Sequence, residues 1–330
     1  MNKSENLKAE RYVTSECSVC GFPVVDTGIN AKPSGYVEHT CPRCSLETRN
    51  LIHPNGGIKH TSLRKYDMVI GKTEGELIND LLSEIQTNSS KNILKVGSFN
   101  ISSYNAKNRL AIKKAMRMVL ENKLNICGIQ EFVMHNDFNS LEMTKTPGAY
   151  NYTDYRETFS NGSASNGNGI VSHNPMYNTT GDQYVTKPGL DKCNPDQNIY
   201  IQGYIKTTIR INNKDVSFYN THFYYCDETE TVVKKQILEL IDIIKKDNTP
   251  YKIVVGDFNH RKSDYYDLFT NIGLKLAFDI YDPNNNMQDG TRTLDNILYS
   301  SNIQLIDAYK VHTPDYATDH DLACAELKLL

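Results

Sequence analysis

The amino-acid sequence predicts an α/β sandwich that contains mixed β-sheets. Many apolar, strand-like segments are separated by only a few helical ones, and the Asn212-Asn213 dipeptide joins two of the strands in a tight turn typical of a β-hairpin. Hairpins pair antiparallel strands, which disfavours an all-parallel doubly wound sheet. A length of 330 residues, with 39% hydrophobic and 23% charged residues, is enough for a sizeable core and excludes a disordered, collagenous or coiled-coil chain.

The N-terminal segment carries two Cys-x2-Cys pairs about twenty residues apart, a spacing typical of a zinc site. Cys17, Cys20, Cys41 and Cys44 can place four thiolates around one ion, and such a closed tetrahedral site is structural. We therefore expect a zinc-ribbon-like module with structural Zn²⁺ over residues 1–62. Four unrelated reduced cysteines, a redox pair, or a histidine replacing one thiolate are the alternatives; the nearby histidines are His39, His53 and His60.

Residues 63–92 are expected to form a helical linker, and residues 93–330 the main domain. A helix over 73–86 has an apolar face that should pack on this domain, and a polar loop should follow over 87–92. The main domain should contain, in order, a strand over 93–101, a helix over 106–123, strands over 125–131, 168–173, 198–211 and 215–222, a helix over 229–246, and strands over 251–257, 294–299, 303–310 and 322–329. The stretch 161–169 is expected to be a surface loop beside a site or a plain connector.

Charge and cysteine usage limit the class of protein further. A formal net charge of −3 excludes a strongly basic protein that coats polyanions, so nucleic-acid binding has to be argued from a site. No run of 18 apolar residues occurs, and the N-terminus is polar, so neither a transmembrane helix nor a signal peptide is expected. The other cysteines, Cys127, Cys193, Cys226 and Cys324, are scattered, which favours a reducing, cytoplasmic setting.

Polar residues that are costly to bury stand at the ends of apolar strands, where one cleft can gather them. Each alone is more often a cap or a turn residue, but their joint occurrence indicates a site. These residues are Asn100, Glu131, His222, Asp257, Asn259, Asp295, Asn296, Asp319 and His320.

Taken in order, these segments resemble the endonuclease/exonuclease/phosphatase superfamily, which has the deoxyribonuclease-I-like fold. The resemblance covers about the last 240 residues, and its most specific motifs are Gly256-Asp257-Phe258-Asn259 and Thr318-Asp319-His320-Asp321. The other matching segments are 97–100, 129–131, 167–175, 220–223 and 294–298. The resemblance implies a four-layer αββα sandwich and hydrolysis of a phosphoester with a divalent ion; the N-terminal cysteine module would be an addition to it.

The resemblance also implies roles for individual residues. Glu131 would be the principal ligand of Mg²⁺ or Mn²⁺, with Asn100 beside it and Asp319 as a further ligand. Asp257 would orient or deprotonate the attacking water, and Asn259 would bind a phosphate oxygen. The imidazole of His320 would contact the phosphate while Asp295 holds it, and His222 would be the second imidazole; Tyr200, Gln202 and Tyr204 are the candidate substrate contacts. Asn296 and Thr318 depart from the family's usual Tyr and Ser.

The sequence thus favours a metal-dependent nuclease with DNA or RNA as its partner, because zinc ribbons often contact nucleic acid. A phosphoesterase acting on a small nucleotide, an inositol phosphate or a lipid headgroup is the alternative. A non-catalytic nucleic-acid-binding protein is the third hypothesis, and it is disfavoured because all the implied site residues are chemically competent.

Overall fold

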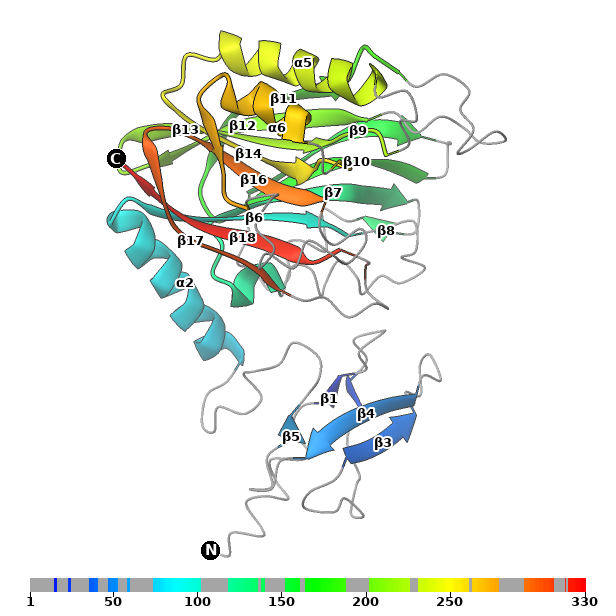
Figure 1. Cartoon of the computed structure of the whole chain (residues 1–330). Coiled ribbons are helices and arrows are strands. Elements are labelled where there is room, and N and C mark those ends of the chain that lie inside the picture. The colour runs from blue at the N-terminus through cyan, green and yellow to red at the C-terminus, as the bar shows by residue number, and fades with distance from the viewer. Residues whose placement is uncertain are drawn as a thin grey trace, which may run out of the picture.

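Two mixed β-sheets form the centre of the fold in the computed structural model (Figure 1). The residues that the structure describes are 15–16, 23–24, 36–40, 47–52, 58–59, 74–101, 118–135, 138–139, 152–160, 164–187, 202–225, 231–260, 263–278, 294–311, 318 and 320–330.

The first sheet has the strand order β17-β18-β6-β7-β10-β9, and β8 pairs with β7. Only β6 and β7 are parallel neighbours among these pairs. The strands are β6 (Ile93–Asn100), β7 (Ile126–His135), β8 (Phe138–Asn139), β9 (Tyr152–Ser160), β10 (Ala164–Ser172), β17 (Ile303–Val311) and β18 (Leu322–Leu329).

The second sheet has the order β11-β12-β13-β14-β16-β15, in which β13 and β14 are the parallel pair. Its strands are β11 (Met176–Gln183), β12 (Gly203–Ile211), β13 (Lys214–His222), β14 (Tyr251–Asp257), β15 (Leu274–Leu276) and β16 (Asp295–Ser300). The hairpin predicted between β12 and β13 is confirmed. Asn212 and Asn213 both have positive φ, at 46° and 63°, as a type I′ turn requires.

The two sheets face each other across an apolar core. Val96 and Ile126 from the first sheet meet Phe218, Val255 and Ile297 from the second, and all are fully buried. Alternation along β12 explains this arrangement, because its odd-numbered residues enter the core and its even-numbered ones face the other way. The sandwich therefore has one shared interior and two outer faces.

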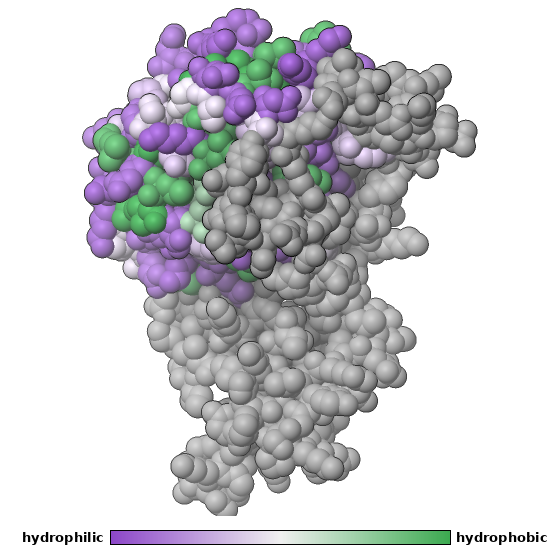
Figure 2. Space-filling model, in the orientation of Figure 1, coloured by the Kyte–Doolittle hydropathy of each residue, from purple (hydrophilic) through white to green (hydrophobic). Residues whose placement is uncertain are grey.

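Helices cover both outer faces, which makes the four-layer arrangement that the resemblance implied (Figure 1). The helix α2 (Glu74–Ser90) places Leu81 and Ile85 against the first sheet, as its apolar pattern predicted. The helices α5 (Thr231–Lys246) and α6 (Ser263–Thr270) cover the second sheet. On the described part of the face in Figure 2, hydrophilic residues predominate and hydrophobic ones form separate patches.

Helix α2 is longer than predicted, because the expected loop over 87–92 continues the helix to Ser90. The hydroxyl groups of Thr87 and Ser89 donate to the carbonyls of Ser83 and Ile85, four residues earlier, so these polar residues satisfy the helix instead of breaking it. The helix ends where Asn92 takes a positive φ of 60°.

The expectation of a loop over 161–169 was also partly wrong. Strand β10 begins at Ala164 and lies between β7 and β9, so its glycines belong to a central strand. Gly167 lies so close to the neighbouring strand that an added Cβ would come within 1.9 Å of the Arg156 carbonyl oxygen. Four further elements are short or strongly polar and were not predicted: strands β9, β11 and β15 and helix α6.

The N-terminal segment contributes five short strands, whose backbone pairs as β1 with β2 and as β3-β4-β5. They are β1 (Ser15–Glu16), β2 (Pro23–Val24), β3 (Tyr36–Thr40), β4 (Glu47–Ile52) and β5 (Ile58–Lys59). The cysteines of the expected zinc module, Cys17, Cys20, Cys41 and Cys44, lie outside the described residues. Among the described helices, none is long and apolar enough to cross a membrane.

Asp247 fixes the C-terminal end of α5 to the second sheet. Its Oδ2 accepts a hydrogen bond from the Tyr219 hydroxyl (2.5 Å) and pairs with Lys206 Nζ (2.9 Å), and its Oδ1 accepts the Thr249 N–H (2.9 Å). Burial alone would raise the pKa of Asp247, but these hydrogen bonds outweigh it and hold that pKa below its ordinary value. The carboxylate therefore stabilises the fold in its charged form.

Asp247→Asn is expected to lower the free energy of unfolding by about 1–3 kcal/mol at pH 7, because buried donors lose a charged acceptor. Since the folded-state pKa is depressed, this stabilisation is present above the ordinary carboxyl pKa of about 4 and is lost as the pH falls. Urea unfolding at pH 7 and at pH 3.5 measures the difference, which should shrink in acid. Asp215→Asn, in an exposed pair with Arg210, is the control and should change much less; equal losses would contradict the argument.

Candidate active site

A row of cross-strand partners on the second sheet carries the acidic and imidazole side chains. His222 on β13 pairs with Asp257 on β14, and Asp257 pairs with Asp295 on β16. Cross-strand partners point to the same face of a sheet. This is the face of Val255 and Ile297, which lie in the inter-sheet core, so the row stands at the end of that core.

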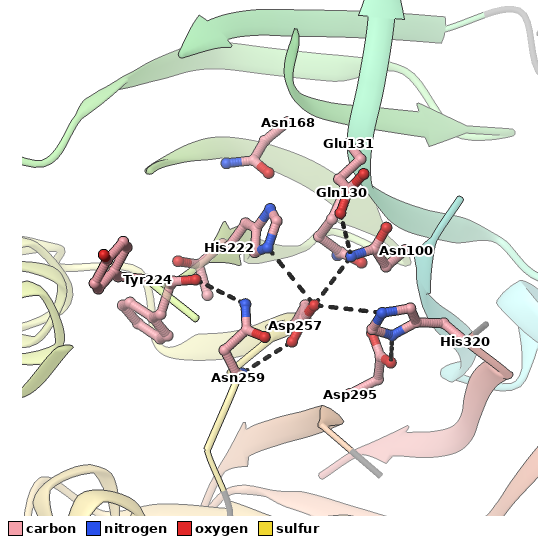
Figure 3. A network of polar contacts seen from close by, with 12 residues as sticks. Asn100, Gln130, Glu131, Asn168, His222, Tyr224, Asp257, Asn259, Asp295 and His320 are labelled. Carbon is pink, nitrogen blue, oxygen red and sulfur yellow. Dashed lines mark hydrogen bonds and ion pairs between the residues drawn. The ribbon is translucent and has the colours of Figure 1, made fainter. Parts of the chain in front are cut away.

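Asp257 is the centre of the polar network and is only 1% exposed (Figure 3). Its Oδ2 accepts a hydrogen bond from Asn100 Nδ2 at 3.0 Å. Two imidazole nitrogens face the same oxygen, His222 Nε2 at 3.6 Å and His320 Nε2 at 3.7 Å. Both distances are longer than a hydrogen bond, so the two rings lie beside the carboxylate without being hydrogen-bonded to this oxygen.

His320 is held in place by Asp295 and Thr318. Its Nδ1 lies 2.6 Å from Asp295 Oδ2, and its backbone N–H donates to the Thr318 hydroxyl, which itself donates to the Asn100 carbonyl. Asp295 is fully buried, and burial raises the pKa of its carboxyl group, although the attraction of His320 opposes that rise. The pair directs His320 Nε2 toward Asp257.

The first sheet supplies Asn100 and Glu131 from the opposite side of the site. Asn100 ends β6 and is 1% exposed; its Nδ2 donates to Glu131 Oε1 at 3.2 Å as well as to Asp257. One carboxamide thus lies between two carboxylates that belong to different sheets. The structure therefore brings together Asn100, Glu131, His222, Asp257, Asn259, Asp295 and His320 from the predicted set (Figure 3).

Glu131 reaches the site because β7 has a bulge. Between the pairs Gly169–Ile129 and Gly167–Phe132, two residues of β7, Gln130 and Glu131, oppose Asn168 alone. Glu131 takes a positive φ of 53°, a conformation that is uncommon for a residue with a long side chain. A bulge re-aims one side chain of a strand, and strain of this kind is often found at functional sites.

Asn259 lies just beyond β14, also with a positive φ, at 54°. Its backbone N–H donates to Asp257 Oδ1 at 2.9 Å, which forms an Asx turn, and its Nδ2 donates to the Phe223 carbonyl at 2.8 Å. This turn holds Asn259 beside Asp257 and ties the end of β14 to the end of β13. Asparagine is among the residues that tolerate this backbone conformation.

The predicted substrate contacts and the third predicted metal ligand are not among the residues that the structure brings together. Tyr200 and Asp319 lie outside the described residues. Tyr204 packs under α5 beside Tyr184, on the face of the sheet away from the row. Gln202 is 5% exposed and precedes Gly203, the cross-strand partner of His222; its Oε1 has no hydrogen-bond partner among the described residues.

Three buried carboxamides beside the site were not predicted as site residues. Asn168 on β10 donates from Nδ2 to the Gly203 carbonyl at 2.7 Å, and its Oδ1 has no hydrogen-bond partner in the described part of the chain. Gln130 and Asn220 bond to each other between the sheets. The available signal was polar residues within apolar strands, since a buried carboxamide needs a specific partner.

The donors in the site fit a hard divalent cation such as Mg²⁺ or Mn²⁺. Glu131 and Asp257 bring two carboxylates near one carboxamide, and in the described ranges neither is ion-paired with a lysine or arginine. The same ranges contain no group of three or more His, Cys, Asp or Glu side chains arranged to hold an ion. Mg²⁺ typically uses one or two carboxylates and completes its shell with water and phosphate oxygens, so the donors suit it better than they suit zinc.

Comparisons with known proteins agree with the fold. The Endonuclease/Exonuclease/phosphatase family matches residues 97–320. No curated protein matches the chain. Among solved structures, an endonuclease/exonuclease/phosphatase from Bacteroides vulgatus is similar, with 18% identity over 72% of this chain and 99% of that chain and a TM-score of 0.55.

Two further structures have the same fold. The human Nocturnin catalytic domain with bound sulfate anion is 16% identical over 73% of this chain and 96% of that one, with a TM-score of 0.55. A humanized D. rerio TDP2 is 12% identical over 72% of this chain and 99% of that one, with a TM-score of 0.52. Members of the family generally hydrolyse phosphoesters and typically use divalent metals such as Mg²⁺. Because the family matches two thirds of this chain, the chain belongs to the endonuclease/exonuclease/phosphatase family.

Proposed function

We propose that the chain is a divalent-metal-dependent phosphodiesterase, and specifically a nuclease that hydrolyses DNA or RNA by in-line attack of water. The observation that carries the proposal is the meeting of Asp257 with two imidazoles, His222 and His320, opposite Glu131 and Asn100. Hydrolysis of a phosphodiester requires an activated water, neutralised phosphate charge and a stabilised leaving oxygen. This set of side chains supplies groups for each need.

Asp257 orients the attacking water and accepts its proton in this mechanism. Its Oδ1 accepts the Asn259 N–H and its Oδ2 accepts Asn100 Nδ2, so each oxygen keeps one further lone pair. The water is assigned to Oδ2, because this oxygen faces both imidazoles. A positioned carboxylate can act as a general base within hydrogen-bond reach of the water.

The phosphate is bound by the hydrogen-bond donors around Asp257. His320, with its Nδ1 held by Asp295, presents Nε2 to a non-bridging oxygen, and Asp295 supports a positive charge on the ring. Asn259 Nδ2 carries a second proton besides the one given to Phe223, and this proton is available to another phosphate oxygen. His222 is the second phosphate contact or the acid that protonates the leaving oxygen.

Glu131 and Asn100 would hold Mg²⁺ or Mn²⁺, with Asp319 as a candidate further ligand. When bound, the ion neutralises the phosphate charge and stabilises the leaving oxygen.

The cysteine spacing of the N-terminal segment supports a polynucleotide as the substrate. The spacing of Cys17, Cys20, Cys41 and Cys44 is that of a structural zinc module, and such modules often contact nucleic acid. Gln202 is buried next to the His222 row, and its Oε1 has no hydrogen-bond partner within the described part of the chain. It is a candidate contact to the substrate, and Tyr200 is a second candidate.

The test is a cleavage panel with purified protein in Mg²⁺ or Mn²⁺. The substrates are supercoiled plasmid, single-stranded DNA, RNA and a soluble phosphodiester, and Asp257→Ala, purified in parallel, controls for contaminating nuclease. Metal-dependent cleavage of a polynucleotide that is absent in the variant supports the proposal. Hydrolysis of the small phosphodiester alone would replace it with a phosphoesterase acting on a small nucleotide or headgroup, and binding of polynucleotide without cleavage of any substrate would indicate a non-catalytic protein.

A further inference from the structure

The side chain of Asn220 crosses from the second sheet to the first directly behind the candidate site. Asn220 lies on β13, two residues before His222 and on the same strand face, and it is fully buried. Its Nδ2 donates to the Ile129 carbonyl of β7 at 2.9 Å and to the Gly169 carbonyl of β10 at 2.8 Å. One carboxamide of the second sheet therefore binds two neighbouring strands of the first.

The two carbonyls belong to the cross-strand pair directly next to the bulge that aims Glu131. Ile129 and Gly169 are the last regular cross-strand pair before the two-against-one step at Gln130, Glu131 and Asn168. A bulge interrupts the ladder of backbone hydrogen bonds, so the strands need other contacts to keep a single geometry there. Both amide protons of Asn220 are donated to these two carbonyls, next to the bulge.

The orientation of Asn220 is itself fixed. Its Oδ1 accepts a hydrogen bond from Gln130 Nε2 at 2.5 Å, and Gln130 also donates to the Ser98 hydroxyl at 3.2 Å. There is no spare space beneath it, because a Cβ added at Gly128 would come within 2.7 Å of Asn220 Cγ. The glycine permits the close approach, and Gln130, the neighbour of Glu131, sets the amide's direction.

From these contacts we infer that Asn220 is a positioning residue for Glu131: it holds the β7 bulge and thereby sets where the Glu131 carboxylate stands relative to His222 and Asp257. Strand β13 then places His222 directly and Glu131 through Asn220, so the positions of both side chains depend on this one strand. The Asn220 amide is bonded to Ile129, Gly169 and Gln130, so Asn220 acts on the site through β7 and not by contact with the reacting groups. Only its consequence for metal binding rests on the proposed function.

The test compares Asn220→Ala with Asn125→Ala. Asn125 is also fully buried and also joins separate segments, accepting the Lys95 N–H at 2.9 Å and donating to Ser89 Oγ at 2.8 Å, but it precedes β7 at the end away from the bulge. Two quantities are measured on each full-length protein: the affinity for Mn²⁺ by electron paramagnetic resonance, and amide hydrogen exchange over residues 128–132 and 167–169 without metal.

Asn220→Ala is expected to weaken Mn²⁺ binding by about 10- to 100-fold, the range seen when a group that orients a metal ligand is lost. Exchange should accelerate at the bulge, while Asn125→Ala changes neither quantity there. The inference is overturned if Asn220→Ala binds Mn²⁺ with wild-type affinity and shows only a general loss of stability like that of Asn125→Ala.

Two further arms keep the test decisive. If Asn220→Ala does not fold, Gln130→Met, which removes the donor to Asn220 Oδ1 at similar volume, takes its place with the same outcomes. If the wild-type protein binds no Mn²⁺, the metal assignment of the proposed function fails, and hydrogen exchange alone decides about Asn220. Faster exchange confined to the bulge then supports its positioning role, and exchange that is unchanged or faster throughout the sheet overturns it.

Discussion

Asp295→Asn is expected to lower kcat/KM by about 10²- to 10⁴-fold without unfolding the protein, as loss of the carboxylate that holds a catalytic imidazole does elsewhere. Asparagine has the shape of the original side chain, but it cannot support a positive charge on His320, whose Nδ1 lies 2.6 Å from Asp295 Oδ2. The measurement is steady-state cleavage of the best substrate from the panel across pH 5–9.

The same substitution should raise the free energy of unfolding although it lowers activity. Burial raises the pKa of Asp295, so the folded protein holds this proton more tightly than the unfolded chain does. A raised pKa stabilises the fold below the ordinary carboxyl pKa, and this contribution is lost as the pH rises through the folded-state pKa. The free energy of unfolding of Asp295→Asn should therefore improve relative to wild type as the pH rises above the ordinary carboxyl pKa of about 4.

His320→Ala provides the internal control for Asp295→Asn. If Asp295 acts through the imidazole, adding Asp295→Asn to His320→Ala should reduce kcat/KM little further, because residues that act as a unit are not additive. Asp242→Asn, on the exposed side of α5, is the matched surface change and should leave activity and stability unchanged. Fully additive losses in the double variant would contradict the assigned role.

Glu131→Gly is expected to lower kcat/KM on the order of 10³-fold, comparable to losing a principal electrostatic group in an active site, yet to cost no stability. The positive φ of Glu131 stores about 1–3 kcal/mol of strain, which glycine relieves. Glycine also adds about 0.5–1 kcal/mol of backbone entropy to the unfolded chain, and the relief of strain offsets this cost or exceeds it. Urea unfolding and cleavage rate are measured on the same preparations.

Two companion variants separate backbone strain from charge. Glu157→Gly, on the exposed part of β9 where φ is not positive, should lower the free energy of unfolding by about 0.5–1 kcal/mol. Glu131→Gln keeps the strained backbone and loses only the charge, so it should match Glu131→Gly in lost activity without a relief of strain. A loss of stability in Glu131→Gly as large as that in Glu157→Gly would show that the bulge is not strained.

The site residues that lie at the ends of regular strands could be predicted from the sequence. Asn100, His222 and Asp257 end strands whose apolar runs are plain, and Asp295 begins one, so strand periodicity places each of them at a strand end. Their joint occurrence then indicates one shared site. The Asn212-Asn213 hairpin was equally readable, because its turn chemistry is local.

Features that depend on neighbours distant in the chain could not be predicted. The bulge that aims Glu131 exists only because β10 opposes β7, and Asn168 and Asn220 find their partners on the other sheet. Helix α2 ran past its expected end because serine and threonine hydroxyls bonded back to their own helix, a choice that composition does not decide.

The row from Gly203 through His222 and Asp257 to Asp295 limits how sequences with this site can diverge. Inserting or deleting one residue within β13, β14 or β16 turns the side chains on one side of the change to the opposite face from those on the other side, so the row member and the core residues of that strand no longer share a face. Length changes are tolerable only in the connections beyond the row. New substrate preferences can therefore arise in those connections, while the strands that carry the row keep their lengths.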